Sequence, residues 1–108
     1  MLLIKAIVRP EKSGDVIEAL FSAGFPALTR MDVSGCGKQR GIRVGSILYN
    51  ELPKDLFYIA CNDEDKDTIV STIIRAARTG EEGEHGDGRI FISALEDAYT
   101  ISTGERGL

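Results

Sequence analysis

The stretch DEDKDTIVSTIIRAARTG, residues 63–80, decides the fold. Its apolar residues recur at intervals of three and four, which is the spacing of one face of an α-helix. Acidic residues open the stretch and Arg75 and Arg78 close it, so the charges complement the helix dipole, and Gly80 follows as a stop signal. The opening acids lack the spacing of a calcium-binding loop, and we attribute them to capping of this helix.

Strand patterns surround this helix, and a second helix precedes it. The expected elements are strand Leu2–Val8, helix Glu11–Ala23 with Gly24 as its C-terminal cap, and strands Ala27–Val33, Leu56–Cys61 and Arg89–Leu95. The order strand, helix, strand, strand, helix, strand predicts an α+β, ferredoxin-like fold, βαββαβ, with a four-stranded antiparallel sheet and two helices on one face. The open face of the sheet also carries apolar residues, which favours an oligomer that covers it.

Length and composition restrict the function. The chain has 108 residues, enough for one domain, which we place at 1–108, and its net charge of −4 makes nucleic acid an unlikely ligand class. The N-terminus lacks the features of a signal peptide and no apolar run is long enough to insert into a membrane, so we expect a cytoplasmic protein. Cys36 and Cys61 have no partner at zinc-ligand spacing and are interpreted as reduced thiols.

Two glycine-rich segments are candidate sites. Residues 35–50 form a long expected loop that begins Gly35-Cys36-Gly37-Lys38-Gln39-Arg40-Gly41, and residues 80–88 form a shorter one that ends Gly86-Asp87-Gly88, followed by Arg89. Glycines beside cations suit a phosphate, but each string taken alone fits a solvated turn equally well. His85, the single histidine, lies among glutamates, where a solvated acidic loop is favoured over a metal site.

Six strings in order resemble the PII (GlnB/GlnK-like) family of nitrogen regulatory proteins along nearly the whole chain. They are Ile4-Lys5-Ala6-Ile7-Val8-Arg9-Pro10, Gly37-Lys38-Gln39-Arg40-Gly41, Leu52-Pro53-Lys54, Ala76-Ala77-Arg78-Thr79-Gly80, Gly86-Asp87-Gly88-Arg89-Ile90-Phe91 and Thr103-Gly104-Glu105. The resemblance implies a homotrimer that binds ATP or ADP with Mg²⁺ in clefts between subunits, and 2-oxoglutarate beside the phosphates. It also implies a T-loop at about 36–53, a B-loop at about 80–88 and a C-terminal loop at about 97–108.

The resemblance assigns roles residue by residue. Expected nucleotide-binding residues are Ile7, Thr29, Gly35, Gly37, Lys38, Gln39, Gly86, Asp87, Gly88, Arg89, Thr100, Ser102 and Arg106. The expected 2-oxoglutarate site consists of Gln39, Lys54 and Gly86, and Gln39 would also contact Mg²⁺. Arg40, Arg43 and Tyr49 are the expected contacts of the T-loop with a protein partner.

This chain departs from the family pattern at positions expected to bind phosphate and in the lengths of its loops. Thr100 and Ser102 stand where the family carries two phosphate-binding arginines, and Arg106 is a candidate replacement. Losing two charge-assisted hydrogen bonds of about 1.5–3 kcal/mol each would weaken triphosphate binding a hundredfold or more. Arg89 replaces a lysine, the B-loop is longer and more acidic, and the T-loop is shorter, with no clear counterpart of the tyrosine that is uridylylated in the family.

The short T-loop and the tail resemble most the nitrogenase-regulating (NifI-type) branch. The implied partners are a second PII-like subunit and dinitrogenase, with an ammonium transporter as the alternative target. We expect a regulatory protein and no enzyme, because the chain shows no evident nucleophile, histidine pair or metal set of the kind that a small ferredoxin-like hydrolase would need. RNA binding through Phe57, Tyr58 and Phe91 is a third class, disfavoured because we expect these aromatic residues to be buried.

Overall fold

The computed structural model describes residues 1–36, 42–44, 47–49 and 51–108. Along the chain the elements are β1 (Leu2–Val8), a 3₁₀ turn η1 (Pro10–Lys12), α1 (Ser13–Ser22), β2 (Thr29–Gly35), β3 (Ile42–Val44), β4 (Ile47–Tyr49), β5 (Leu52–Cys61), a second 3₁₀ turn η2 (Asp63–Asp65), α2 (Lys66–Ala77) and β6 (Gly88–Ala94). The predicted ferredoxin-like α+β fold is confirmed, with a short strand pair added between its second and third main strands.

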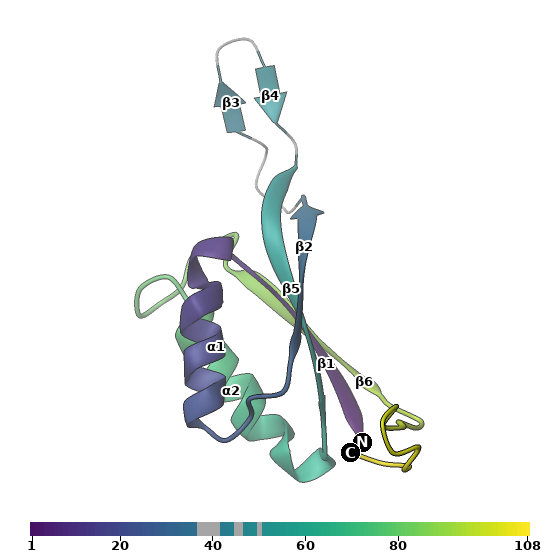
Figure 1. Ribbon diagram of the computed structural model, residues 1–108. Helices are drawn as coiled ribbons and strands as arrows, with labels where there is room; N and C mark the ends of the chain where they lie inside the picture. Colours follow the sequence, from purple (N-terminus) through teal and green to yellow (C-terminus); the bar gives the residue numbers. More distant parts are fainter. Residues whose placement is uncertain (37–41, 45–46, 50) are drawn as a thin grey trace.

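The main sheet has the strand order β2-β5-β1-β6, and every neighbouring pair is antiparallel. Both helices lie on the same face of this sheet (Figure 1). The register places Ile4 of β1 between Ile59 of β5 and Ile92 of β6. Because side chains alternate along a strand, these three residues face the helices, and their neighbours in sequence face the other way.

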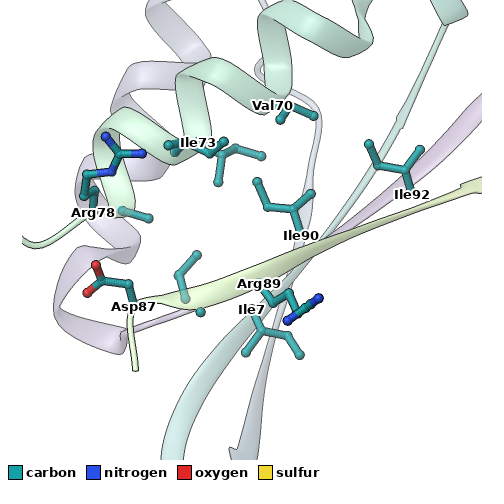
Figure 2. Close-up of a pocket in the computed structure, with 12 residues that line it drawn as sticks. Ile7, Val70, Ile73, Arg78, Asp87, Arg89, Ile90 and Ile92 are labelled. Atoms are coloured by element: carbon teal, nitrogen blue, oxygen red, sulfur yellow. The ribbon is translucent and has the colours of Figure 1, made fainter. Parts of the chain in front are cut away.

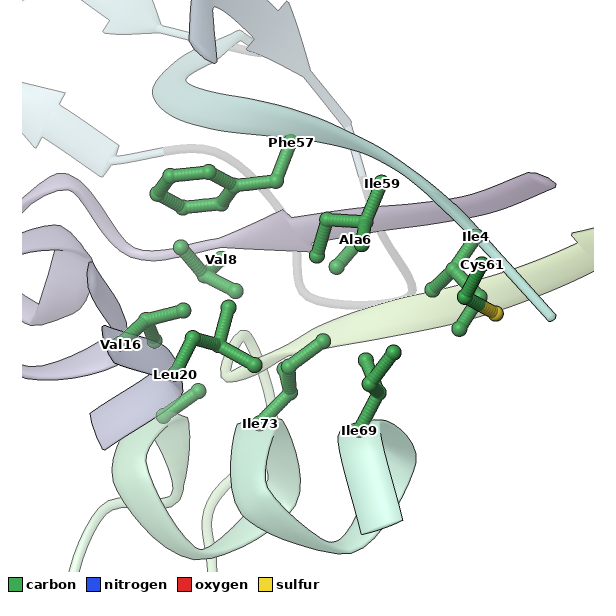
Figure 3. Packing of buried hydrophobic residues seen from close by; sticks show 11 residues of the cluster. Ile4, Ala6, Val8, Val16, Leu20, Phe57, Ile59, Cys61, Ile69 and Ile73 are labelled. Atoms are coloured by element: carbon green, nitrogen blue, oxygen red, sulfur yellow. The ribbon is translucent and has the colours of Figure 1, made fainter. Parts of the chain in front are cut away.

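The hydrophobic core fills the space between the sheet and the two helices (Figure 3). Alternate residues of β1 are buried, and Phe57 of β5 is the largest of the fully buried side chains. The helices contribute Val16 and Leu20 from α1 and Ile69 and Ile73 from α2, which recur at helical spacing. Each such side chain contributes about 1.5–3 kcal/mol when fully buried, so the helices are held mainly by this contact.

Helix starts and ends differ slightly from the sequence prediction. The first helix begins at Ser13, two residues late, because Pro10 starts a 3₁₀ turn instead. At its end Gly24 has φ +95°, and Phe25 N–H donates to the Leu20 carbonyl over 2.8 Å, which confirms the expected glycine cap. The prediction that the acids at 63–65 cap α2 is wrong in detail: they form a 3₁₀ turn, and no side-chain cap bond is made.

The strand after the long loop begins earlier than predicted. It starts at Leu52, not Leu56, so residues 52–55, expected in the loop, belong to β5. Proline lacks an N–H and normally interrupts a central strand. Pro53 is tolerated because β1 ends at Val8, opposite Asp55, so that the start of β5 pairs with β2 alone. The strand β2 is displaced two residues toward the C-terminus from the predicted 27–33, and β6 one residue toward the N-terminus from the predicted 89–95.

Part of the predicted T-loop forms a hairpin of its own. The strands β3 and β4 pair with each other as a separate two-stranded sheet, with Ile42 opposite Tyr49. Hydrophobic periodicity gave no sign of these three-residue strands, because so short a segment contains less than two repeats of the pattern.

The sheet face away from the helices carries a mixed surface. Lys5 lies over the Tyr58 ring at 5.6 Å from the centroid, and Met31 and Phe91 are exposed to 37% and 50%. The sequence prediction of apolar residues on this face is therefore confirmed. Within the described residues, no helix is long and apolar enough to cross a bilayer.

Candidate functional site

The loop between α2 and β6 is folded tightly against the end of the sheet. It has glycines at 80, 83 and 86 with positive φ, and Gly88 follows at φ +120°. A Cβ on Gly88 would lie 1.7 Å from the Ile7 carbonyl oxygen and 2.8 Å from the Ile7 carbonyl carbon. Only glycine therefore allows the loop to enter β6 this close to β1.

Asp87 organises this loop through both oxygens of its carboxylate. Oδ1 accepts hydrogen bonds from Thr79 Oγ1 (2.6 Å) and Arg9 Nε (3.0 Å). Oδ2 accepts from the backbone N–H groups of Glu84 (2.8 Å) and Thr79 (3.0 Å). One side chain therefore joins the end of α2, the middle of the loop and the end of β1.

Two cations hold consecutive backbone carbonyls of the loop. Arg9 Nη2 donates to the His85 carbonyl oxygen over 2.9 Å, and Lys54 Nζ donates to the Gly86 carbonyl oxygen over 2.5 Å. Arg9 follows β1 directly and Lys54 lies near the start of β5, so both cations are carried by the central strands of the sheet.

The electrostatics of the cluster follow from these contacts. Burial raises the pKa of the Asp87 carboxyl, but hydrogen bonds from Thr79, the Glu84 N–H and Arg9 outweigh it and hold the pKa well below its usual range. Burial, followed by the positive charge of Arg9, lowers the pKa of Lys54 below its ordinary value of 10.5. The loop therefore holds Asp87 as a carboxylate, and Arg9, which follows β1, offsets its negative charge.

A groove of about 470 Å³ runs between α2 and β6 and ends at this loop. Figure 2 shows Ile90 and Ile92 pointing from β6 toward α2, with Arg89 and Ile7 on the other side of the strand and Asp87 at the end of the groove. The groove thus has an aliphatic wall and a polar end. Such a combination suits a ligand with an apolar body and a polar group.

The structure brings several of the predicted site residues together around the loop before β6. Ile7 is opposite Arg89 in the β1–β6 register, Gly88 is opposite Val8, and the Gly86 carbonyl oxygen accepts a hydrogen bond from Lys54. The Asp87 carboxylate is occupied by contacts within the chain, so it positions the loop.

The remaining predicted residues that the structure describes lie elsewhere in the chain. Thr29 begins the edge strand β2, opposite Tyr58, and Gly35 ends it, opposite Leu52. Thr100 and Ser102 are exposed in the tail that follows β6, whereas the 80–87 loop precedes this strand, so the two segments lie at opposite ends of the sheet (Figure 1). In the same tail Tyr99 pairs with Arg106 in an isolated bridge.

Several predictions fall on residues whose side chains the structure does not describe. Gly37, Lys38, Gln39 and Arg40 lie outside the described residues, including the predicted metal contact of Gln39. For Arg43 and Tyr49 the structure gives the backbone placement in β3 and β4. Their assigned roles remain predictions from the resemblance.

Two residues of the cluster were missed in the sequence. Arg9 and Thr79 belong to strings that carry the family resemblance, but neither was assigned a role. Arg9 contacts Asp87 across 78 positions of the sequence, and Thr79 contacts it across 8. Local sequence patterns do not reveal such pairs. The one sequence signal that could have indicated Arg9 is its position directly after a predicted strand.

The three aromatic residues considered for RNA stacking differ in burial. Phe57 is fully buried, as expected, whereas the expected burial of Phe91 is wrong, since it is half exposed on the edge strand β6. Among the described residues, no group of three or more His, Cys, Asp or Glu side chains is arranged to hold a metal ion.

Comparison with known proteins identifies the family. The model of the family "Nitrogen regulatory protein P-II" matches residues 1–105. The chain belongs to the PII family. It is 51% identical over 108 residues to the "Nitrogen fixation nifHD region GlnB-like protein 1" of Methanothermobacter marburgensis and 49% identical over 108 residues to the protein of the same description in Methanothermococcus thermolithotrophicus, each covering 100% of both chains.

A more distant relative carries a general PII name. The "Nitrogen regulatory protein P-II 2" of Methanothermobacter thermautotrophicus is 44% identical over 96% of this chain and 91% of its own length. The PII chain is thus a nitrogen regulatory protein, most similar among these three to relatives named after nitrogen fixation regions, which bears out the predicted branch.

Proposed function

We propose that this PII chain forms a homotrimer that senses ATP or ADP, with Mg²⁺, together with 2-oxoglutarate, and that it regulates nitrogen fixation by binding a target through its T-loop. Binding would shift the T-loop between arrangements, and the target would respond to that shift. Regulation of nitrogenase is the favoured function, and Arg40, Arg43 and Tyr49 are the candidate contacts with dinitrogenase.

The observation that carries this proposal is the contact between Lys54 and the Gly86 carbonyl oxygen. The residue expected to bind the carboxylate of 2-oxoglutarate lies against the loop expected to bind phosphates. A dicarboxylate and a triphosphate both require cations and closely approaching backbone. Lys54, which contacts the Gly86 carbonyl oxygen, and Arg89, which follows Gly88, are candidates to supply them beside the loop. Gln39 is the candidate protein contact of Mg²⁺, which when bound would supply positive charge beside the anionic ligands.

The proposal needs more than one copy of the chain. Within one subunit the B-loop and the C-terminal tail lie at opposite ends of the sheet (Figure 1), so Thr100, Ser102 and Arg106 cannot join Gly88 and Arg89 in a single nucleotide site. A neighbouring subunit can supply the tail. The partly apolar open face of the sheet, with Met31 and Phe91 exposed, is the candidate interface.

The relatives support the choice of process. Their names place them in nitrogen fixation regions, and the identity extends over the full length of each chain. The alternative target, also within the PII family, is an ammonium transporter. A second PII-like subunit is the proposed companion at dinitrogenase.

Calorimetry on the purified oligomer tests ligand sensing. The native mass should correspond to three subunits, ATP and ADP should each give a binding isotherm, and 2-oxoglutarate should bind in the presence of ATP and Mg²⁺. If none of these ligands gives heat, either alone or in combination, the proposal is contradicted. A monomeric mass would contradict the shared site.

Affinity capture distinguishes the two targets. Tagged PII chain is presented to purified dinitrogenase and, separately, to detergent-solubilised ammonium transporter, with and without 2-oxoglutarate. Retention of dinitrogenase that changes with 2-oxoglutarate supports the nitrogenase function. Retention of the transporter alone would transfer the function to ammonium uptake.

A further inference from the structure

Arg9 is the one side chain that contacts the B-loop at both a carboxylate and a backbone carbonyl, among the contacts that the described residues show. Its Nε lies 3.0 Å from Asp87 Oδ1 and its Nη2 lies 2.9 Å from the His85 carbonyl oxygen. The third nitrogen, Nη1, faces Glu11 Oε1 at 4.0 Å. The guanidinium is therefore turned toward the loop and toward Glu11.

The planar shape of the guanidinium makes this arrangement rigid. Its donors form a fixed fork, so two acceptors can be held at once in a set geometry, which a lysine ammonium does not reproduce. The Arg9 and Asp87 side chains are only 25% and 18% exposed, so water screens the pair less than it screens a surface pair. The backbone behind Arg9 is fixed as well, because Val8 is paired with Gly88 across β1 and β6.

The loop needs such a support, because it contains three glycines before Gly88 and would otherwise be free to adopt many conformations. Asp87 attracts four hydrogen-bond donors, and Arg9 is the one among them that carries a positive charge. Without this charge the Asp87 carboxylate would face a bound phosphate as an uncompensated like charge. Arg9 holds the loop through both contacts, and its charge would offset that repulsion when a phosphate binds.

We propose that Arg9 is a positioning residue for the nucleotide: it holds the 80–87 loop through the Asp87 carboxylate and the His85 carbonyl, and it sets nucleotide affinity without touching the nucleotide. This inference rests on the proposed function, since it requires that the loop binds an adenine nucleotide. Arg9 is not among the residues expected to contact the nucleotide, yet it would control nucleotide affinity.

The test measures two quantities on the same oligomeric samples. The first is amide hydrogen exchange of residues 80–87 without ligand, and the second is the Kd for ATP with Mg²⁺. For Arg9→Gln we expect exchange in the loop to accelerate and the Kd to rise, each by roughly ten- to hundredfold. Arg9→Lys keeps the charge but not the fork, and should fall between Arg9→Gln and the unchanged protein in both measurements.

Arg30→Gln is the matched control. Arg30 lies on β2, the edge strand opposite β6, and its Nη1 is 3.7 Å from Asp55 Oδ2 of β5. This variant therefore also removes one arginine–aspartate pair and one positive charge. It should lower the melting temperature without changing loop exchange or the Kd. If Arg30→Gln weakens ATP binding as much as Arg9→Gln does, the effect is general destabilisation and the positioning role is wrong.

The outcomes separate this inference from the proposed function. If the unchanged protein binds ATP and Arg9→Gln alters neither exchange nor Kd, Arg9 is not a positioning residue, while nucleotide sensing stands. Faster loop exchange with an unchanged Kd likewise overturns the positioning role. If the unchanged protein binds no adenine nucleotide, the proposed function fails and this inference fails with it.

Discussion

Lys54 donates a hydrogen bond from Nζ to the carbonyl oxygen of Gly86, over a distance of 2.5 Å, and so joins the start of β5 to the loop before β6. An ammonium group has three donors, so Lys54 can keep this bond and also bind an anion. The position of the loop and the binding of an oxoacid thus depend on the same cation.

Lys54→Met tests this dependence, because methionine retains most of the side-chain length and removes the charge. We expect 2-oxoglutarate to bind at least about tenfold more weakly, since a hydrogen bond to a charged group contributes ~1.5–3 kcal/mol. Calorimetry at saturating ATP and Mg²⁺ measures the change. Lys66→Met removes a lysine at the start of α2, whose Nζ lies 3.6 Å from Asp67 Oδ1, and should leave 2-oxoglutarate affinity unchanged. Equal affinities in all three proteins would remove Lys54 from the oxoacid site.

Asp87 should make the protein sensitive to acid. Hydrogen bonds hold the pKa of the folded Asp87 carboxyl far below 3.8, its value without these contacts. A carboxyl with a depressed folded pKa stabilises the fold fully above its unfolded pKa, and this contribution is lost as the pH falls below about 4 toward the folded pKa. In urea unfolding between pH 7 and pH 2.5, we expect Asp87→Asn to be less stable at pH 7 and to lose less further stability below pH 4.

The control for this pH profile is Asp67→Asn. The Asp67 side chain is 95% exposed, so water screens its contacts and the fold should depend little on its charge. Its profile should run parallel to that of the unchanged protein. A profile for Asp87→Asn that is equally parallel would show that the depressed pKa of Asp87 does not contribute to acid sensitivity.

The sequence predicted those parts of the fold that depend on local pattern. Strand β1 has the predicted bounds, and the apolar positions of α2 are the ones that pack on the sheet, because a buried face imposes a period that a single sequence displays. The start of β5 could not be predicted. Pro53 is a strand breaker by its own chemistry, and it is tolerated only because β1 ends opposite Asp55, which is a property of the pairing.

The candidate site was predictable in composition but not in geometry. Glycines beside cations in residues 86–89 fitted an anion site as well as a solvated turn, and the structure places Gly86 against Lys54. The direction of the Asp87 side chain could not be inferred, because its partners Thr79 and Arg9 come from a helix end and a strand end that only the fold brings together.

Gly88→Ala should disrupt the β1–β6 pairing. The new Cβ would lie 1.7 Å from the Ile7 carbonyl oxygen, and φ +120° is strained for alanine in any surroundings. We expect a loss of at least ~3 kcal/mol, from backbone strain together with displacement of the strand. Urea unfolding at fixed protein concentration measures it, since the stability of an oligomer depends on concentration.

Gly14→Ala is the opposite case and serves as the control for Gly88→Ala. Gly14 lies in the first turn of α1, and a Cβ there would meet nothing within 4 Å. Alanine should stabilise the protein by about 0.5–1 kcal/mol, because it restricts the unfolded chain and suits the helix. If both variants shift stability in the same direction, the close approach of Gly88 to Ile7 is not what makes this glycine necessary.

Ser13→Ala should reveal how the start of α1 is attached to the sheet. Ser13 Oγ donates to Asp55 Oδ2, and both residues are buried, with 2% and 5% of their surface exposed. Arg30 Nη1 also faces this oxygen, at 3.7 Å, which is too distant to replace the hydroxyl. An unpaired buried carboxylate oxygen costs about 1–3 kcal/mol, so urea unfolding at pH 7 should show a loss of that size. Ser71→Ala removes an exposed hydroxyl that donates to the Thr68 carbonyl over 3.1 Å, and should change stability by less than about 0.5 kcal/mol. Equal losses for the two serines would mean that the Asp55 carboxylate does not depend on Ser13, and that packing of Val16 and Leu20 alone holds this helix.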